Sequence, residues 1–400
     1  MVVVGASLAG LAAAVRLARV GHHVVVLDRR PGPSEPWLRS PVVELPAAWR
    51  DVFRKSGRIF DAALAVEGLE LVGAPPTLHE FADGSQIALP TDRGQQYAAL
   101  ASLVDDRAAG AWRDLVDAAD DTWQRVRRAG LETEADLADP LFADPRTVES
   151  EARRLPDERL AELVRSVARR LGSDPAETPY WLLSRLSVDR LFGRWLVTRE
   201  GVPQPSETLD ALLLRRAEDR GVELRWGMTA TTVRPTGVTT DSGDLEAAAV
   251  VSAVGYDAHA ALVGRAPATL TAPRRLGPLH VGTRRIPVEP PASTTSEVQA
   301  DGGPVEVVRH SPSGTTTTWT LGERALVSQG APSAAGLRWR GPGTVAAYHP
   351  LDDGVWHAGS GSIAGTEPWA RLLTGALATY RVHEQLTGDD IRPSNKAYRP

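Results

Sequence analysis

The stretch that decides the fold is MVVVGASLAGLAAAVRLARVGHHVVVLDRR, residues 1–30. Its apolar residues 2–4 predict a buried strand, and residues 8–20 predict an Ala- and Leu-rich helix that ends at Gly21. Residues 24–27 predict a second strand, which runs into Asp28. A strand, a turn, a helix and a strand in this order are typical of a parallel α/β sheet. We therefore expect an α/β protein with a Rossmann-like domain.

The turn after the first strand has the composition of a dinucleotide-binding turn. Gly5 permits the tight turn, and Gly10 lets the helix pack close to the strand. A pyrophosphate would lie at the helix amino terminus, where unpaired N–H groups and the helix dipole favour negative charge. Asp28 follows the turn at the sequence spacing that is typical of a carboxylate that binds ribose hydroxyls. The predicted contacts with the dinucleotide are Gly5, Ala6, Ser7, Leu8, Ala9, Gly10 and Asp28.

Ser7 stands where the G-x-G-x-x-G pattern has its middle glycine. Its side chain narrows the space in which the backbone meets the pyrophosphate, although its hydroxyl could donate a hydrogen bond to a phosphate. We expect weaker cofactor binding rather than none. The alternative is a strand–helix–strand unit that binds no nucleotide.

Composition excludes several function classes. The chain has 400 residues, enough for about two domains, and a net charge of -5 without a Lys/Arg tail, so no nucleic-acid partner is expected. It has no cysteine, and its histidines show no metal-ligand spacing, so no metal site is expected. Met1 leads directly into the first strand, which predicts a cytoplasmic protein without a leader and a true start a few residues upstream.

Further elements follow from periodicity and turn residues. Helices are predicted over residues 93–129, 160–171, 180–196, 209–219 and 368–386, and residues 47–72 look helical and then extended. A hairpin is predicted over residues 78–89, with its turn at Asp83 and Gly84. Strands are predicted over residues 222–226, 250–255 and 355–358, a hairpin over 229–240, and a small antiparallel sheet within 265–345.

Four segments together resemble the phytoene desaturase-like branch of the flavin amine oxidase superfamily. They are residues 1–30, the hairpin at 78–89, residues 221–257 and residues 354–380. The resemblance implies an FAD-binding domain assembled from residues 1–46, 197–264 and 346–400. Residues 47–196 and 265–345 would form an α+β substrate domain with an antiparallel sheet and helices.

The resemblance also implies cofactor contacts beyond the first turn. Val233 would offer its backbone to the adenine, and Gly255 would follow a short strand-to-loop motif. The turn before the last helix would pass beneath the flavin, with contacts from Gly359, Ser360, Gly365 and Thr366. Three features depart from the family pattern. The Gly-Gly-Arg motif is missing, so that Arg29, Arg30 or Arg39 could supply its charge; Ser360 replaces an aspartate; and Glu367, Pro368 and Trp369 stand where small residues usually approach the ring.

By this resemblance the chain is an FAD-dependent desaturase or dehydrogenase of an apolar, carotenoid- or isoprenoid-like substrate. An external acceptor, oxygen or a quinone, would reoxidise the flavin, since no second glycine fingerprint for a nicotinamide cofactor is present. The enzyme could also contact a membrane peripherally. No catalytic residue is identified, and the pocket candidates are His357, Trp369 and Tyr348.

Two alternatives stay open. One is an amine or porphyrinogen oxidase, or a flavin-dependent isomerase, of the same fold. Amine oxidases of this superfamily often place a lysine near the flavin, and neither Lys55 nor Lys396 matches such a motif. The other is a non-catalytic relative that keeps the fold as a binding module, an idea that Ser7, Ser360 and the missing Gly-Gly-Arg motif all support.

Overall fold

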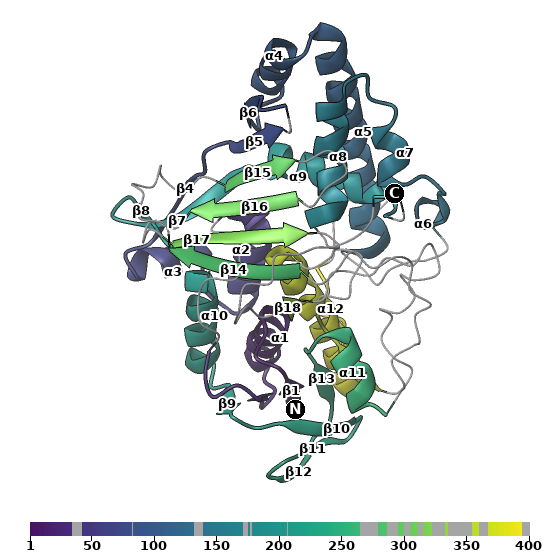
Figure 1. Ribbon diagram of the computed structural model, residues 1–400. Coiled ribbons are helices and arrows are strands. Elements are labelled where there is room, and N and C mark those ends of the chain that lie inside the picture. The colour runs from purple at the N-terminus through teal and green to yellow at the C-terminus, as the bar shows by residue number, and fades with distance from the viewer. Residues whose placement is uncertain are drawn as a thin grey trace.

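The computed structural model of the chain is shown in Figure 1. The residues that the structure describes are 1–33, 42–81, 83–131, 139–170, 175–176, 178–205, 207–264, 279–285, 295–299, 305–310, 315–321, 333–334, 354–359 and 367–393. Arg39, Tyr348, Ser360, Gly365 and Thr366 lie outside these residues.

A five-stranded parallel sheet carries the amino-terminal unit. Its order is β19-β13-β1-β2-β9, and its strands are β1 (Val2–Val4), β2 (Val25–Asp28), β9 (Glu223–Trp226), β13 (Val250–Ser252) and β19 (Val355–His357). Val3 pairs with Val26 on one side and Val251 on the other. This sheet confirms the expected α/β fold.

Alternate residues of these strands serve two different layers. Val3, Val26 and Val251 belong to the core cluster that contains α1 (Leu8–Arg19). Val2 and Val4 belong to a second cluster beneath a three-stranded antiparallel sheet of β10 (Ala230–Arg234), β11 (Gly237–Thr240) and β12 (Gly243–Glu246). Valine-rich strands buried on both faces are typical of such a layered parallel sheet.

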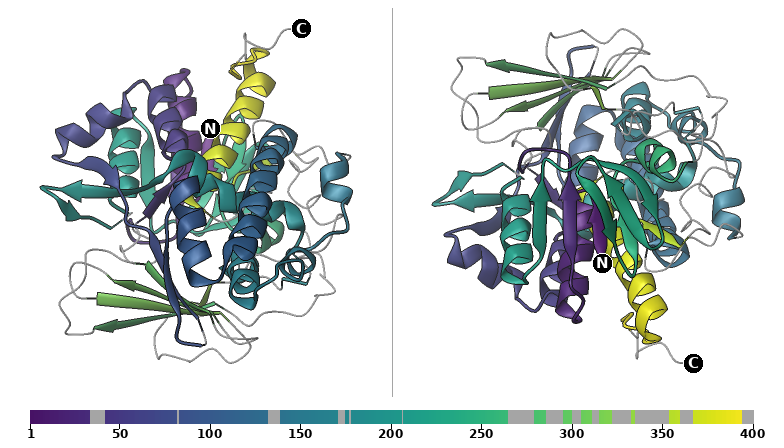
Figure 2. Two further views of the ribbon diagram at one scale, coloured as in Figure 1. Left: turned by 90° about the horizontal axis from the view of Figure 1, so that it is seen from above. Right: turned by 90° about the horizontal axis from the view of Figure 1, so that it is seen from below.

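Several helices complete the layers around this sheet. α12 (Pro368–Thr387) packs along α1, and α10 (Glu207–Asp219) and α2 (Pro46–Lys55) also contact α1. Figure 2 shows α12 beside the amino-terminal helices in both of its views. The helices α3 (Phe60–Val66) and α11 (Tyr256–Leu262) follow α2 and β13, respectively.

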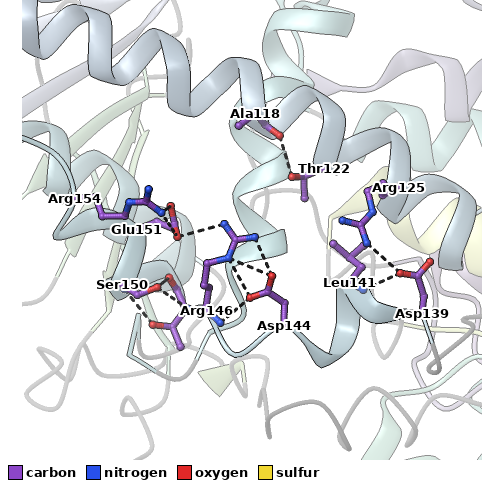
Figure 3. Close-up of polar contacts among 11 residues, drawn as sticks. Ala118, Thr122, Arg125, Asp139, Leu141, Asp144, Arg146, Ser150, Glu151 and Arg154 are labelled. Atoms are coloured by element: carbon purple, nitrogen blue, oxygen red, sulfur yellow. Dashed lines mark hydrogen bonds and ion pairs between the residues drawn. The ribbon is translucent and has the colours of Figure 1, made fainter.

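A helical group lies at the far side of the molecule (Figure 1). It contains α4 (Arg93–Leu103), α5 (Asp106–Gly130), α6 (Pro140–Ala143), α7 (Val148–Ala152), α8 (Glu158–Arg170), a 3-10 helix over Tyr180–Ser184 and α9 (Arg185–Phe192). Ion pairs join its outer residues: Arg146 lies between Asp144 and Glu151 (Figure 3).

Two sequence predictions in this group are corrected. The predicted helix over residues 93–129 is broken before α5, because the Asp105 side chain accepts a hydrogen bond from the Ala108 amide at 2.7 Å and starts a new helix. The predicted helix over residues 180–196 ends at Gly193, whose φ of +73° stops it. Strand β7 (Arg194–Arg199) follows instead, between β3 (Val42–Glu44) and β4 (Glu70–Gly73), and it pairs with β8 (Val202–Pro203).

A seven-stranded sheet adjoins the helical group, where α4 contacts β6 (Gln86–Leu89) and α8 contacts β15 (Thr295–Gln299) and β16 (Val305–His310). Its other strands are β5 (Thr77–Phe81), β14 (Leu279–Arg285), β17 (Thr315–Leu321) and β18 (Ser333–Ala334). β5 and β6 form the predicted hairpin, whose turn is held by Asp83 accepting from the Ser85 amide. β15 pairs parallel with β5, and the other pairings in this sheet are antiparallel.

No helix among the described residues is long and apolar enough to cross a lipid bilayer.

The parallel sheet joins residues from 2–28, 223–252 and 355–357. The division of the chain into an FAD-binding and a substrate domain at the stated boundaries stays a prediction.

Candidate cofactor site

The turn from β1 into α1 has the geometry that its glycines predict. Gly5 has a φ of +104°, and a Cβ there would lie 2.9 Å from the carbonyl oxygen of Ala253. A Cβ on Gly10 would collide with the Gly5 carbonyl. Both positions therefore require glycine, because the chain approaches itself too closely for any side chain. The first turn of α1, with Leu8 and Ala9, exposes backbone N–H groups that have no partner inside the helix.

Ser7 is the N-cap residue of α1, and its hydroxyl is engaged within the protein. The hydroxyl donates a hydrogen bond of 2.8 Å to the carbonyl oxygen of Ala253 and accepts one of 3.3 Å from the Gly10 amide. The hydroxyl hydrogen is thus already donated to a carbonyl of the loop after β13, and the expected donation to a phosphate stays a prediction. The hydroxyl thereby ties the nucleotide turn to the neighbouring strand.

Asp28 is buried at the end of β2, and its carboxylate has four hydrogen-bond donors. Oδ2 accepts from the Ala6 amide at 2.8 Å and from Arg30 Nη2 at 2.8 Å. Oδ1 accepts from the backbone N and the Nε of Arg30, at 2.9 and 2.8 Å. Burial alone would raise the pKa of Asp28, but the hydrogen bonds from Arg30 and Ala6 outweigh it and hold the pKa below its usual value. The carboxylate is therefore ionised, and its hydrogen bond from the Ala6 amide holds the turn in place.

Arg30 extends the same network to the turn itself. Its Nη2 also donates to the Ala6 carbonyl at 3.2 Å, and its charge lies beside Asp28, which raises the pKa of Arg30. The guanidinium is about one-third exposed and stands next to the predicted pyrophosphate position. Arg29 points to solvent as an exposed residue. Of the two, Arg30 is the one placed to supply positive charge at the turn.

The carboxyl ends of β13 and β19 meet beside this turn. The Ala358 amide donates to the Ser252 carbonyl at 2.8 Å, and the Nε2 of His357 is 2.9 Å from the Val254 carbonyl. A Cβ on Gly359 would lie 3.0 Å from that same carbonyl, so the two loops touch. Gly255 follows at the amino end of α11. The segments around residues 5–10, 252–255 and 357–359 therefore form one edge of the sheet, where ligands of α/β proteins bind.

His357, a predicted pocket residue, ends β19 and is partly exposed, and its place in a pocket stays a prediction. Burial lowers the pKa of His357, and the hydrogen bond to the Val254 carbonyl opposes this shift only in part. The ring is therefore neutral, with Nε2 as the donor. Its ring lies 4.8 Å from that of His259 on α11. These contacts make His357 a residue that holds two loops together.

Trp369 lies in the first turn of α12 with its side chain buried, and its place beside a pocket stays a prediction. Its ring meets Trp123 edge to face, with the ring centres 5.7 Å apart, and Trp123 meets Phe192 in the same way. The indole N–H groups of Trp123 and Trp369 are buried without a hydrogen-bond partner in the described structure. These two unsatisfied donors lie at the amino end of α12, and an unpaired buried donor costs about 1–3 kcal/mol.

Val233 lies in β10, where its side chain is buried and its backbone pairs with Val238. Its contact with an adenine stays a prediction.

Sequence reasoning missed Ala253, which accepts from Ser7, and Thr374, whose hydroxyl donates to the Gly359 carbonyl at 3.3 Å. Neither residue carries a local signal, because each acts through a partner that only the fold brings near.

The chain matches the family described as FAD dependent oxidoreductase over residues 1–334. It belongs to that family. FAD is its cofactor, and the glycine cradle, the amino end of α1 and Arg30 are features that fit a dinucleotide. Gly5 permits the tight turn, and Gly10 permits the close packing of α1, that a dinucleotide-binding turn requires.

Two characterised desaturases are similar in sequence. Hydroxyneurosporene desaturase of Cereibacter sphaeroides is 30% identical over 258 residues, which are 57% of this chain and 49% of that protein. Phytoene dehydrogenase of Streptomyces griseus is 30% identical over 320 residues, 71% of this chain and 60% of that protein. The matched regions thus span about half to three-fifths of the length of these relatives.

Solved structures of amine oxidases share the fold. Putrescine oxidase bound to putrescine superimposes with a TM-score of 0.63 at 13% identity, covering 97% of this chain and 98% of that one. Cyclohexylamine oxidase from Brevibacterium oxydans IH-35A also gives a TM-score of 0.63, at 17% identity, covering 96% and 98% of the two chains. At this level of identity the likeness concerns the fold alone.

Proposed function

We propose that this FAD-dependent oxidoreductase is a desaturase or dehydrogenase of an apolar, isoprenoid-like substrate. The observation that carries the proposal is the 30% identity with phytoene dehydrogenase over 71% of this chain, whereas the amine oxidases share only the fold. When bound, FAD supplies the two-electron acceptor that conversion of a carbon–carbon single bond into a double bond requires. An external acceptor, oxygen or a quinone, would take the electrons onward.

The side chains near the predicted flavin turn support an apolar substrate. Trp369, Trp123 and Phe192 form a chain of aromatic contacts at the amino end of α12. Arg185 and Glu367 form an ion pair at this end of α12, through two hydrogen bonds of 2.6 and 2.9 Å. An unactivated hydrocarbon gains nothing from a free charge, so a region whose charges are paired suits it.

The position of Lys55 speaks against the amine oxidase alternative. Lys55 is the last residue of α2, and the next residue, Ser56, is held by Arg216 at the carboxyl end of α10. That end of α10 leads into the amino end of β9, whereas the nucleotide turn follows the carboxyl end of β1. The two features therefore lie at opposite ends of the parallel strands. Lys55 therefore lies away from the flavin, and Lys396 is outside the described residues.

The test is the visible spectrum of the purified protein and its response to substrates under anaerobic conditions. We expect a yellow protein whose flavin absorption bleaches with a polyene precursor such as phytoene and stays unchanged with putrescine or cyclohexylamine. Bleaching by an amine would replace the proposal with the oxidase reading. Colourless protein that takes up no FAD in excess would support the non-catalytic alternative instead.

A further inference from the structure

Four arginines gather where three helices end, at the edge of the sheet away from the nucleotide turn. We call Arg19, Arg58, Arg216 and Arg220 the arginine cluster. Arg19 ends α1, Arg58 follows α2, and Arg216 and Arg220 lie at the end of α10. α1 and α10 each run back along the sheet before the next parallel strand, so their carboxyl ends lie at the amino ends of β2 and β9. A helix of the length of α1 places the cluster about 18 Å from the turn at Gly5.

The contacts bring the four side chains together. Arg216 is 8% exposed; its Nε donates to the Ser56 hydroxyl at 3.1 Å and its Nη2 to the Ser56 carbonyl. At Gly57, which has a φ of +84°, a Cβ would lie 3.0 Å from Arg19 Nε and would collide with Arg220 Nη2. The guanidinium groups of Arg19 and Arg220 therefore lie side by side over Gly57.

The positive charge of the cluster lacks matching acids. The side chains of Arg19, Arg58 and Arg220 have no ion pair or hydrogen-bond partner in the described part of the chain, and Arg220 Nε is buried. Asp219 is 3.5 Å from Arg216, but its side chain is 58% exposed. Burial lowers the pKa of Arg216, and the charges of Arg220 and Arg58 lower it further.

Several other arginines of the described residues are compensated by carboxylates. Arg165 contacts Glu149, Glu158 and Glu162, and Arg190 contacts Asp117 and Asp120. Arg146 in Figure 3 lies between two carboxylates. The cluster is thus a local exception in a chain whose net charge is -5.

The helix ends do not account for the cluster. Each helix carboxyl terminus carries roughly half a negative charge, so three of them offset about one and a half charges. Asp219 offsets at most one more. Four guanidinium groups therefore leave more than one positive charge without a partner. A bound anion would balance this charge.

We propose that the arginine cluster is a binding site for a phosphate group. Guanidinium groups match the geometry of phosphate oxygens, and several of them around one point bind it through charge-assisted hydrogen bonds. Ile59, next to Arg58, is 69% exposed, and Val20, next to Arg19, is also exposed. A phosphate that carries an apolar tail would contact these side chains, so a free phosphate and a lipid headgroup share the chemistry that the site recognises.

The test uses the full chain saturated with FAD, so that the nucleotide turn is filled. Inorganic pyrophosphate is titrated at constant ionic strength while the melting temperature is followed. Cosedimentation is then measured with vesicles of phosphatidylglycerol or of phosphatidylcholine. The cluster variant carries Arg58→Gln and Arg220→Gln. The control carries Arg113→Gln and Arg234→Gln, which remove the same charge from the partly exposed α5 and β10 surfaces.

We expect wild type and control to be stabilised by pyrophosphate, and the cluster variant to need at least about tenfold more of it. Without phosphate the cluster variant should melt no lower than wild type, because the like charges no longer repel. Binding to phosphatidylglycerol vesicles without a response to pyrophosphate would identify a lipid headgroup as the ligand. Equal responses of the cluster variant and wild type to both probes, or no response to either probe, would overturn the proposal.

Discussion

Ser7 and Asp28 form hydrogen bonds within the protein at the positions where a nucleotide is predicted to bind. Ser7 donates to Ala253, and Asp28 accepts from Ala6 and Arg30. Each bond stabilises the turn in the absence of a ligand, since a buried hydrogen bond contributes about 1 kcal/mol and one to a charged group more. The turn is thus preorganised, while its serine keeps a side chain in the space of the middle glycine.

The substitution Ser7→Gly separates these two effects. We expect it to lower the free energy of unfolding of the FAD-free protein by about 1–2 kcal/mol, through loss of the bond to Ala253 and of the cap. We expect FAD to bind more tightly, because the backbone can approach the pyrophosphate. Urea unfolding and FAD titration measure the two changes.

Ser7→Ala is the matched control. It removes the same hydroxyl but keeps a Cβ, so it should lose stability without gaining affinity for FAD. If Ser7→Gly binds FAD no better than wild type, the serine does not restrict the cofactor.

His22 and His383 form a pair that responds to pH. The Nε2 of His22 is 2.9 Å from the Nδ1 of His383, and burial together with the charge of His383 lowers the pKa of His22 below 6.5. The neutral ring is favoured in the folded state, so its contribution to stability is complete above pH 6.5 and is lost as the pH falls below that value. Melting temperatures should therefore decline between pH 7 and pH 5, and less steeply in His22→Gln. Parallel curves for the two proteins would contradict this.

At the scale of elements, the contact between α1 and α12 depends on Gly375. A Cβ there would collide with the Ala9 carbonyl and lie 3.0 Å from the Ala12 Cβ. Gly375→Ala must push α12 away from α1, and we expect it to destabilise the protein by about 1–3 kcal/mol. Because Ala9 lies in the nucleotide turn, FAD affinity should fall as well.

Gly110 provides the control for this prediction. It lies inside α5 with nothing within 4 Å of its Cβ position. Gly110→Ala should stabilise the protein by about 0.5–1 kcal/mol and leave FAD binding unchanged. Chemical denaturation of both variants checks the difference in sign, and equal effects would refute the packing argument.

The elements that sequence predicts well are those whose signal is local. The turn at Gly5 and Gly10, the hairpin at Asp83 and the helix α12 are set by neighbouring residues. The predicted helix over residues 180–196 runs past its true end into the start of β7, because no local pattern encodes the pairing of β7 with β3 and β4. The same holds for the site. Asp28 and the glycines belong to a local sequence motif, so sequence predicts them. The Ser7 hydroxyl donates to a carbonyl 246 residues away, which no local pattern encodes.

At the scale of the whole molecule, Arg185 and Glu367 connect the helical group to the start of α12. Their side chains are 14% and 20% exposed, and the two hydrogen bonds run in parallel. Glu367 is the N-cap residue of α12 but makes no cap hydrogen bond with its side chain, because Arg185 holds the carboxylate. The pair therefore fixes where α12 begins relative to the helices.

A double-mutant cycle measures this connection. Arg185→Gln and Glu367→Gln should each destabilise the protein by about 1–3 kcal/mol, since each breaks the partly buried ion pair between the two residues. The double variant should lose less than the sum of the two. Both single variants should also weaken FAD binding, read from flavin fluorescence, because the start of α12 shifts. Additive losses would show that the two residues act independently.

The order of the parallel sheet has a consequence for synthesis in the cell. β1 is made first, yet its neighbour β13 ends at residue 252, and β19, beyond it, at residue 357. While the ribosome adds the intervening residues, the valines of β1 have no partner on that side, and the nascent chain must be protected from aggregation. The end of the sheet beside the nucleotide turn is complete only when β19 has been made, so a chain that stops before residue 355 is expected to bind no flavin.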